Sequence, residues 1–346
     1  RYYKTYTPLI AERHNPMCGI CGILHTRNKE AVKPEKINAM LAALKHRGPD
    51  DQGIYCSDHN DPAPIRVGLG HRRLTIIDLS SSGHQPMTNE DGSVWIVFNG
   101  EIYNFHELRN ELLEKGHRFT SQTDTETVIH LYEEYGKDCL RYLRGMFAFA
   151  LWDKREQTLF LARDRAGKKP LFYYWDGIHF CFASELASLL ESGLIAKKIK
   201  TDAIDSYLSF GYIPSPSTIY ENVHKLAPAH MLTLKNNVVK TERYWQLDFT
   251  KKLSISESDA AAETIRLLKE AVRIRLYSDV PLGAFLSGGI DSSTVVALMA
   301  ELSSGKVKTF SIGFQEAAFS ELAYARNIAQ RYSTEHHEFI VKPNAL

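Results

Sequence analysis

The sequence predicts two domains of different classes: an α+β domain of stacked antiparallel sheets with helices outside, followed by an α/β domain with a parallel sheet. Many short strand patterns with only two or three helical patterns between them occupy residues 18–205, which is typical of antiparallel sheets covered by helices. Residues 258–346 instead alternate helix, strand, glycine-rich loop, helix, strand and helix, the rhythm of a parallel βαβ sheet. At 346 residues the chain is also long for a single core.

The composition narrows the class of protein. Acidic and basic residues nearly cancel, leaving a formal net charge of +1, so the charge does not call for nucleic acid. No apolar run reaches the roughly 18 to 20 residues that cross a membrane, and residues 1–16 lack the apolar centre of a secretory signal. Five cysteines, an odd number, suit a reducing compartment better than a disulfide framework. We therefore expect a cytoplasmic protein without nucleic-acid or membrane partners.

The start of the chain stands apart from the rest. Residues 1–16 show neither helical nor strand periodicity and end in Asn15 and Pro16, a turn signal. Met17 is the first methionine in the sequence. We therefore expect residues 1–17 to be an extension or leader that the mature protein lacks.

The first domain consists of strand patterns, which are short, apolar and bounded by turn residues, at residues 19–25, 65–69, 74–78, 94–98, 146–152, 158–162, 170–175 and 179–183. Helical patterns cover residues 34–44 and about 105–116, and a third helix begins at the capping box of Thr123 and Glu126. A loop at residues 46–51 follows the first helix. Strands therefore outnumber helices, as stacked antiparallel sheets require.

The second domain follows a change of character around residues 197–217. We expect residues 206–257 to be a linker and interdomain segment, with a hairpin-like pattern at its centre. Beyond it, loop 287–293 (SGGIDSS) lies where a strand passes into a helix, so its backbone N–H groups could hold an anion. The alternative is a plain glycine-rich turn, and the loop lacks the Gly-Lys-Ser/Thr ending of a Walker A motif.

Several motifs together resemble a known family. The segments MCGI from Met17, HRGPD from His46, FNGEIYN from Phe98 and GMFAFA from Gly145 are similar to a class II glutamine amidotransferase domain. SGGIDSS is similar to the pyrophosphate-binding loop of ATP pyrophosphatase domains, and the two in this order resemble glutamine-hydrolysing asparagine synthetases.

The resemblance implies a fold and a division of the chain. It implies an N-terminal-nucleophile αββα sandwich over residues 18–205 and the first part of the synthetase ATP-binding domain over residues 258–346. The second nucleotide motif of that family, Ser-Gly-Glu-Gly-Xaa-Asp-Glu, does not occur in this sequence. We therefore expect an incomplete parallel sheet and a polypeptide competent only for the glutaminase half of the reaction.

Cys18 is the predicted nucleophile. If Met17 is removed, Cys18 carries a free α-amine, which with a pKa of about 7.7 to 8.0 is a good base near neutrality. The thiol would attack the side-chain amide of glutamine and release ammonia from a thioester. The alternative for Cys18 and Cys21 is a redox or zinc CxxC motif, which has no second CxxC here.

The resemblance supplies roles for the rest of the glutamine site. It implies an oxyanion hole from the Asn99 side chain and the Gly100 N–H, although that dipeptide alone equally suits a tight turn. It places Arg73 on the α-carboxylate of glutamine and Glu101 and Asp124 on its α-ammonium, whereas Asp124 alone would suit a helix N-cap. The predicted glutamine-binding residues are Arg73, Leu74, Thr75, Ile76, Ile77, Asn99, Gly100, Glu101 and Asp124.

For the second domain the resemblance implies that ATP adenylates aspartate and that ammonia then displaces AMP to give asparagine. Glutamine, aspartate and ATP would be substrates, Mg²⁺ the metal ion, and a homodimer is compatible with the family. The candidate Mg²⁺ ligand is Asp291, and Leu286 and Ile312 also suit strand-core roles. The predicted ATP-binding residues are Leu286, Ser287, Gly288, Gly289, Asp291, Ser292 and Ile312.

Two other functions stay open at this point. One is an amidotransferase of the same build that acts on a carboxylate other than aspartate. The other is a module that binds glutamine or nucleotide without catalysis.

Overall fold

The computed structural model describes residues 17–27, 30–58, 65–78, 80–316 and 320–341. The chain divides into two compact units, one ending at Leu247 and the other beginning at Asp248. The predicted extension at residues 1–17 lies outside the described residues except for Met17. Among the helices that the structure describes, none is long and apolar enough to cross a membrane.

The first unit contains a six-stranded antiparallel sheet, here called sheet A, in the order β10-β8-β9-β1-β3-β2. Its strands are β1 (Gly19–His25), β2 (Asp51–Cys56), β3 (Arg66–Arg73), β8 (Phe172–Trp175), β9 (His179–Ala183) and β10 (Val223–Lys225). The inner strand β1 pairs with β3 on one side and β9 on the other, and all seven of its residues are buried. The backbone that follows Cys18 is therefore fixed inside the sheet.

A second six-stranded antiparallel sheet, sheet B, has the order β12-β11-β7-β6-β5-β4. Its strands are β4 (Met87–Thr88), β5 (Val94–Ile102), β6 (Gly145–Asp153), β7 (Thr158–Arg163), β11 (His230–Lys235) and β12 (Val238–Arg243). The full length of β5 pairs with β6. Asn99, Gly100 and Glu101 thus occupy fixed positions near the carboxyl end of β5.

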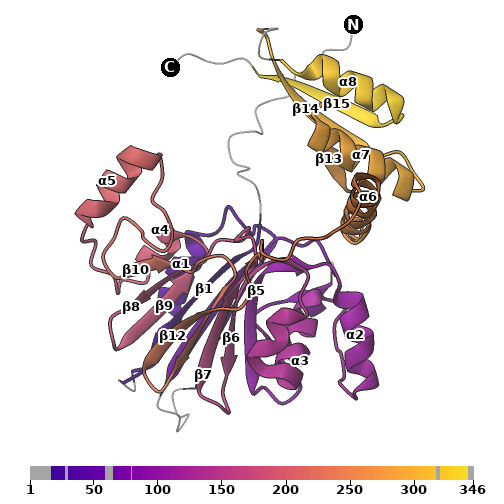
Figure 1. The fold of residues 1–346 in the computed structure, drawn as a ribbon. Coiled ribbons are helices and arrows are strands. Elements are labelled where there is room, and N and C mark those ends of the chain that lie inside the picture. The colour runs from indigo at the N-terminus through magenta and orange to yellow at the C-terminus, as the bar shows by residue number, and fades with distance from the viewer. Residues whose placement is uncertain (1–16, 28–29, 59–64, 79, 317–319, 342–346) are drawn as a thin grey trace, which may run out of the picture. The chain divides into compact units, whose positions relative to one another are not determined.

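Helices cover the outer faces of the two sheets (Figure 1). The helices α1 (Pro34–Ala42) and α4 (Leu186–Leu190) pack on sheet A. Sheet B is covered by α2 (Phe105–Glu114), α3 (Asp124–Tyr135) and the 3-10 helix η2 (Gly136–Arg141). Between the sheets lies a further apolar core that includes Trp152, Phe180 and Phe182. The αββα sandwich implied by the sequence is confirmed.

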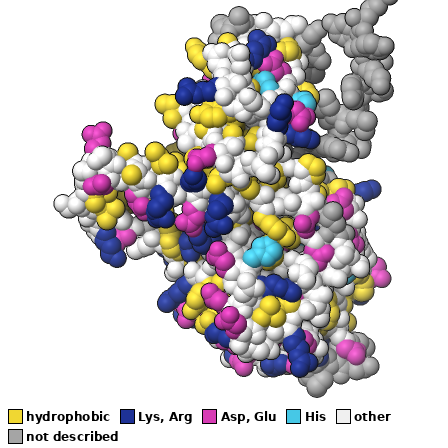
Figure 2. All heavy atoms as spheres, turned by 90° about the vertical axis from the view of Figure 1, so that its right-hand side faces the viewer, with side chains coloured by type: hydrophobic (Ala, Val, Ile, Leu, Met, Phe, Trp, Pro, Cys, Tyr) yellow, Lys and Arg dark blue, Asp and Glu magenta, His cyan; other side chains and the backbone are white. Residues whose placement is uncertain are grey.

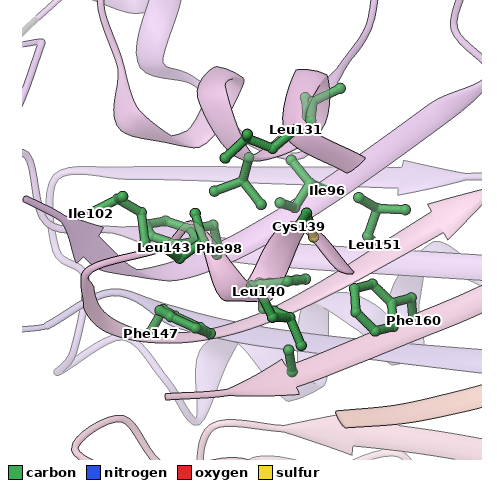
Figure 3. Close-up of a cluster of buried hydrophobic side chains, with 14 of the residues drawn as sticks. Ile96, Phe98, Ile102, Leu131, Cys139, Leu140, Leu143, Phe147, Leu151 and Phe160 are labelled. Atoms are coloured by element: carbon green, nitrogen blue, oxygen red, sulfur yellow. The ribbon is translucent and has the colours of Figure 1, made fainter. Parts of the chain in front are cut away.

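The core between sheet B and its helices consists of large apolar side chains from both layers. Figure 3 shows residues of β5, β6 and β7 beside those of α3 and η2, among them Ile96, Phe98, Phe147, Leu131 and Leu140. Burial of each large side chain contributes roughly 1.5 to 3 kcal/mol to folding. This core therefore holds α3 firmly against the strand that carries Asn99.

The second unit contains a parallel sheet in the order β13-β14-β15. Its elements are α6 (Glu257–Arg273), β13 (Gly283–Phe285), α7 (Ile290–Leu302), β14 (Lys308–Phe314), α8 (Leu322–Arg331) and β15 (Glu335–Val341). Each crossover between neighbouring strands contains one helix. The predicted parallel βαβ arrangement is confirmed, and the sequence pattern missed only its last strand, β15.

The strand predicted at residues 74–78 is wrong, because this segment forms a loop after β3. Asp78 adopts a positive φ of 53°, which a strand does not contain. The carbonyl groups of Ile77 and Asp78 accept hydrogen bonds from the Arg73 side chain. The apolar run therefore wraps around a guanidinium group, and its apolar residues do not pair with another strand.

Two short helices of the first unit complete its description. The 3-10 helix η1 (Ser81–Gly83) follows the loop after β3, and α5 (Thr201–Phe210) follows α4. Residues 206–257, predicted to be a linker and interdomain segment, contain β10, β11 and β12, which belong to the two sheets.

The face of the molecule in Figure 2 has Lys and Arg side chains interspersed with Asp and Glu, the mixed charge that the composition leads us to expect.

Candidate active site

A pocket in the first unit collects residues from the start of β1, the end of β5 and the N-terminus of α3. Of the ten residues predicted for glutamine chemistry, it is lined by Cys18, Arg73, Leu74, Ile76, Ile77, Asn99, Gly100, Glu101 and Asp124. Thr75 is the exception, since its N–H donates to Asp50 Oδ2 at 2.8 Å, beside the pocket. Residues far apart in the sequence are thus brought together around one thiol.

Two loops hold Cys18 in place. Its Sγ lies 3.4 Å from the backbone nitrogen and 3.5 Å from the carbonyl oxygen of Leu74. The carbonyl oxygen of Cys18 accepts a hydrogen bond from Arg47 Nε at 3.0 Å, and Arg47 also pairs with Glu185 at 2.8 Å. Cys18 is therefore held at its side chain by Leu74 and at its backbone by Arg47.

The electrostatic environment of the Cys18 thiol combines opposing effects. Burial raises its pKa, and the Asp124 carboxylate raises it further. The Leu74 N–H, the Lys169 ammonium and the Arg73 guanidinium lower it. Because burial is the largest of these effects, the resting thiol stays protonated and needs a base to become a nucleophile.

Asn99 is fully buried and lines the pocket. Among the described residues, neither its Nδ2 nor its Oδ1 has a hydrogen-bond partner. A buried polar group without a partner costs about 1 to 3 kcal/mol, so an unsatisfied amide at this position favours a binding role. Next to it, a Cβ on Gly100 would lie 2.4 Å from the Met146 carbonyl oxygen, which explains the glycine.

Arg73 is the main cation of the pocket. Its Nη1 donates to the Ser80 carbonyl at 3.0 Å, and its Nη2 donates to the carbonyls of Ile77 at 3.3 Å and Asp78 at 2.5 Å. A Cβ on Gly83 would lie only 1.9 Å from Nη2. The loop after β3 therefore shapes itself around this guanidinium, and Gly83 leaves the space that it needs.

Asp124 and Glu101 give the pocket an acidic side. Asp124 Oδ2 accepts a hydrogen bond from the Ile102 N–H at 2.8 Å. Burial raises the pKa of Asp124 to about 7, against the effect of that hydrogen bond, and the Glu101 carboxylate adds to the rise. The N-cap of α3 is Thr123, whose Oγ1 accepts from the Glu126 N–H at 3.3 Å. The alternative interpretation of Asp124 as the N-cap is therefore wrong, and Asp124 lines the pocket.

Sequence reasoning missed Lys169, a buried residue of the same pocket. Its Nζ lies 3.2 Å from the Met17 Sδ. The loop that carries it is built around the Asp164 carboxylate, which accepts the N–H groups of Ala166, Lys168 and Lys169. A pair of neighbouring lysines resembles an exposed turn in the sequence, so no local pattern pointed to a buried cation.

In the second unit, residues 286–289 join β13 to α7, and the rest of the predicted loop 287–293, from Ile290 on, forms the first turn of α7. Ser287 Oγ and Ser292 Oγ lie 2.9 Å apart, and Ser287 Oγ accepts the Gly289 N–H at 3.2 Å. Gly288 has a φ of +84°, and a Cβ there would lie 2.4 Å from the Tyr324 Cβ. Gly289 is the N-cap of α7 and places no side chain on the first N–H groups of the helix, so these stay available for an anion.

Five of the seven predicted ATP-binding residues line two hollows of the second unit. Leu286, Ser287, Ser292 and Ile312 line one hollow at the carboxyl edge of the parallel sheet. Asp291 lies in another hollow, which Ser292 also borders. Leu286 is 2% exposed and Ile312 is 56% exposed, so a core role suits only Leu286.

Comparisons with known proteins give a consistent picture. Residues 17–245 match the family described as "Glutamine amidotransferase domain", and residues 263–346 match "Asparagine synthase". The chain is 43% identical to "Putative asparagine synthetase [glutamine-hydrolyzing] 2" of Methanocaldococcus jannaschii, covering 94% of this chain and 65% of that one. It is 38% identical to "Asparagine synthetase [glutamine-hydrolyzing] 1" of Bacillus subtilis, covering 94% and 50%. It is also 38% identical to "Amidase chry2" of Gibberella zeae, covering 83% and 43%. The chain thus spans between 43% and 65% of the length of these relatives.

Proposed function

Because the chain belongs to the family of glutamine amidotransferase domains, we propose that its first unit hydrolyses glutamine to glutamate and ammonia at Cys18. One observation carries this proposal: the Cys18 thiol and the unpartnered amide of Asn99 line the same pocket. A nucleophile and an unoccupied hydrogen-bond donor for the oxyanion are two of the groups that acyl transfer requires.

The chemistry follows from these groups. With Met17 removed, the α-amine of Cys18 takes the proton from the thiol, and the thiolate attacks the side-chain amide carbon of glutamine. Asn99 Nδ2 and the Gly100 N–H stabilise the oxyanion of the tetrahedral intermediate. The protonated amine returns its proton to the leaving nitrogen, ammonia departs, and water hydrolyses the thioester to glutamate.

The two ends of the amino-acid substrate find complementary charges in the pocket. Arg73 would pair with the α-carboxylate of glutamine, while Asp124 and Glu101 would pair with its α-ammonium. A cation between the two acids would also offset the repulsion that helps to raise the pKa of Asp124. The test uses a chain expressed from Met17, with the loss of Met17 verified by intact-mass measurement. This protein should convert added glutamine to glutamate. Absence of release from such a protein would contradict the proposal.

Glutamine binding is expected to weaken as the pH falls through 7. Asp124, whose pKa is about 7, becomes neutral below that pH and no longer attracts the substrate ammonium. The dissociation constant should rise about tenfold one unit below the pKa, where one site in ten is ionised. Calorimetry on Cys18→Ala protein between pH 5.5 and 8.5 measures this without turnover. The control is the double variant Cys18→Ala/Asp124→Asn, which should bind glutamine weakly at every pH. A dissociation constant that does not change with pH in Cys18→Ala would refute the role of Asp124.

Lys169→Met is expected to make the Cys18 thiol less reactive. Loss of the buried ammonium removes a charge that lowers the thiol pKa, so alkylation of Cys18 by iodoacetamide near pH 7.5 should slow about threefold to tenfold. Peptide mass spectrometry can follow Cys18 separately from the other cysteines. Lys168→Met changes the exposed neighbour and should leave the rate unaltered; equal rates in both variants would rule out an electrostatic effect of Lys169.

For the protein to which the second unit belongs, we infer synthesis of asparagine from aspartate, ATP and glutamine-derived ammonia. The support is the match of residues 263–346 to the asparagine synthase family and the names of the relatives. Loop 287–293 would bind the diphosphate of ATP, and Asp291 would be a ligand of Mg²⁺. A cytoplasmic location suits this use of ATP and the free thiols of all five cysteines.

A different acceptor is the second candidate, because an amidase is as similar to this chain as one of the synthetases is. The test supplies a chain of the relatives' length with ATP, Mg²⁺, glutamine and aspartate. Asparagine and AMP in equal amounts would support the first candidate. Glutamate release without asparagine would favour another carboxylate, and a protein that binds glutamine without releasing glutamate would be a non-catalytic module.

A further inference from the structure

Two histidines and a glutamate converge outside the glutamine pocket, where the loop after α2 packs on the middle of α3. His117, His130 and Glu133 each present one ligand atom within 4.8 Å of the other two. His130 and Glu133 lie one helical turn apart on α3, and His117 precedes that helix. The two imidazole rings pack together, with centroids 4.8 Å apart.

The carboxylate of Glu133 faces both rings. Its Oε2 lies 2.8 Å from His130 Nδ1 and 3.7 Å from His117 Nδ1. Its other oxygen accepts a hydrogen bond from Asn89 Nδ2 at 2.7 Å. Three potential metal ligands, two nitrogens and one oxygen, thus point at one another, and the position of the carboxylate is fixed from behind.

The remaining nitrogen of each ring also faces a carboxylate. His117 Nε2 lies 3.0 Å from Glu134 Oε1, and His130 Nε2 lies 3.9 Å from Glu126 Oε1. Histidines that bind a metal through one nitrogen usually direct the other toward a carboxylate or carbonyl, which orients the ring and strengthens the ligand. Both histidines therefore have the surroundings that metal-binding histidines have.

Burial and charge favour a divalent cation here. The His130 side chain is 1% exposed, whereas those of His117 and Glu133 are 15% and 20% exposed, so an ion can enter from solvent. The carboxylates of Glu126, Glu133 and Glu134 lie around the two rings. Lys115 Nζ pairs with Glu134 Oε2 at 3.0 Å, the oxygen that does not face His117. Without a metal ion, protons on the imidazole nitrogens bridge them to the Glu133 carboxylate. A bound metal ion would take the place of these protons.

We propose that His117 Nδ1, His130 Nδ1 and Glu133 Oε2 bind a divalent transition metal ion of the Zn²⁺ type. Two imidazoles and one carboxylate form a common zinc ligand set, with a water molecule as the fourth ligand. The ion would fasten the loop after α2 to α3, the helix whose first residue, Asp124, lines the glutamine pocket. It would stabilise that helix without taking part in glutamine hydrolysis.

The test is a titration of the full chain with ZnCl₂ after treatment with a chelator, in a Cys18→Ala background so that the reactive thiol cannot bind zinc. We expect one equivalent of Zn²⁺ bound with micromolar or tighter affinity, and a higher thermal unfolding temperature. His117→Gln and Glu133→Gln should each weaken binding at least tenfold, while His230→Gln, at a partly exposed histidine far along the sequence, should not.

Circular dichroism of the metal-free variants shows whether they fold. Folded variants that still bind one equivalent with unchanged affinity would overturn the proposal, as would a parent chain that binds no Zn²⁺. In those outcomes the same residues form an ion-pair network that holds α3 without metal. Glutaminase activity of the unmodified thiol protein does not enter this test, so the two proposals can fail separately.

Discussion

Cys18→Ala is expected to abolish glutamate release from glutamine, with a loss of at least about 10⁴-fold in turnover, because Cys18 is the one thiol among the described residues that line the pocket. The protein should be expressed from Met17, and its intact mass should show that Met17 has been removed. Steady-state formation of glutamate is the measurement. The variant should still bind glutamine, since Arg73, Glu101 and Asp124 are unchanged.

Cys56→Ala is the matched control for this loss. Cys56 is a partly exposed free thiol on β2 and does not line the pocket. Its variant should keep full activity. Undiminished turnover in Cys18→Ala, or an equal loss in both variants, would show that Cys18 is not the nucleophile.

Asn99→Ala should lower kcat about 10²- to 10³-fold, the usual effect of losing one oxyanion donor. The free energy of unfolding should change little or rise, because neither amide atom of Asn99 makes a hydrogen bond in the folded protein. Loss of activity without loss of stability is the pattern expected of a group reserved for the transition state. Kinetics at saturating glutamine and urea denaturation measure the two quantities.

Asn104 lies in the same FNGEIYN motif as Asn99, and Asn104→Ala should show the opposite pattern, a loss of stability without a loss of activity. The Asn104 side chain donates to the Tyr142 carbonyl at 3.0 Å and accepts the Arg144 N–H at 2.9 Å. Its removal should cost about 1 to 3 kcal/mol of stability and leave kcat nearly intact. A parallel loss of kcat and stability in Asn99→Ala would mean that Asn99 is a structural residue.

Much of the fold could be predicted because its strands are short apolar runs bounded by turn residues. The sequence pattern predicted β1 and β9 at their observed bounds, and the hairpin of β11 and β12 follows from a similar pattern. It missed β2, which starts with the polar residues Asp51 and Gln52. At residues 74–78 it failed because an apolar run can line a pocket as readily as it can pair in a sheet.

The candidate site was predictable to the extent that short motifs carry it. Cys18, Asn99 and Gly100 lie in such motifs, and they meet in one pocket. Lys169 could not be found in this way, since a buried cation and an exposed one have the same sequence letter. Only the folding of the loop around Asp164 brings Lys169 beside the thiol.

The hydrogen bonds of Arg73 have a consequence for how substrate enters. A guanidinium has five N–H donors, and three contacts to loop carbonyls occupy both of its terminal nitrogens. A carboxylate that binds two donors at once, the geometry that arginine favours, must therefore displace Ile77 or Asp78 from Nη2. With the α-carboxylate of glutamine on Arg73, substrate and loop would compete for one guanidinium. Capture of glutamine would then require Ile77 or Asp78 to move, and its association rate should fall below the diffusion limit.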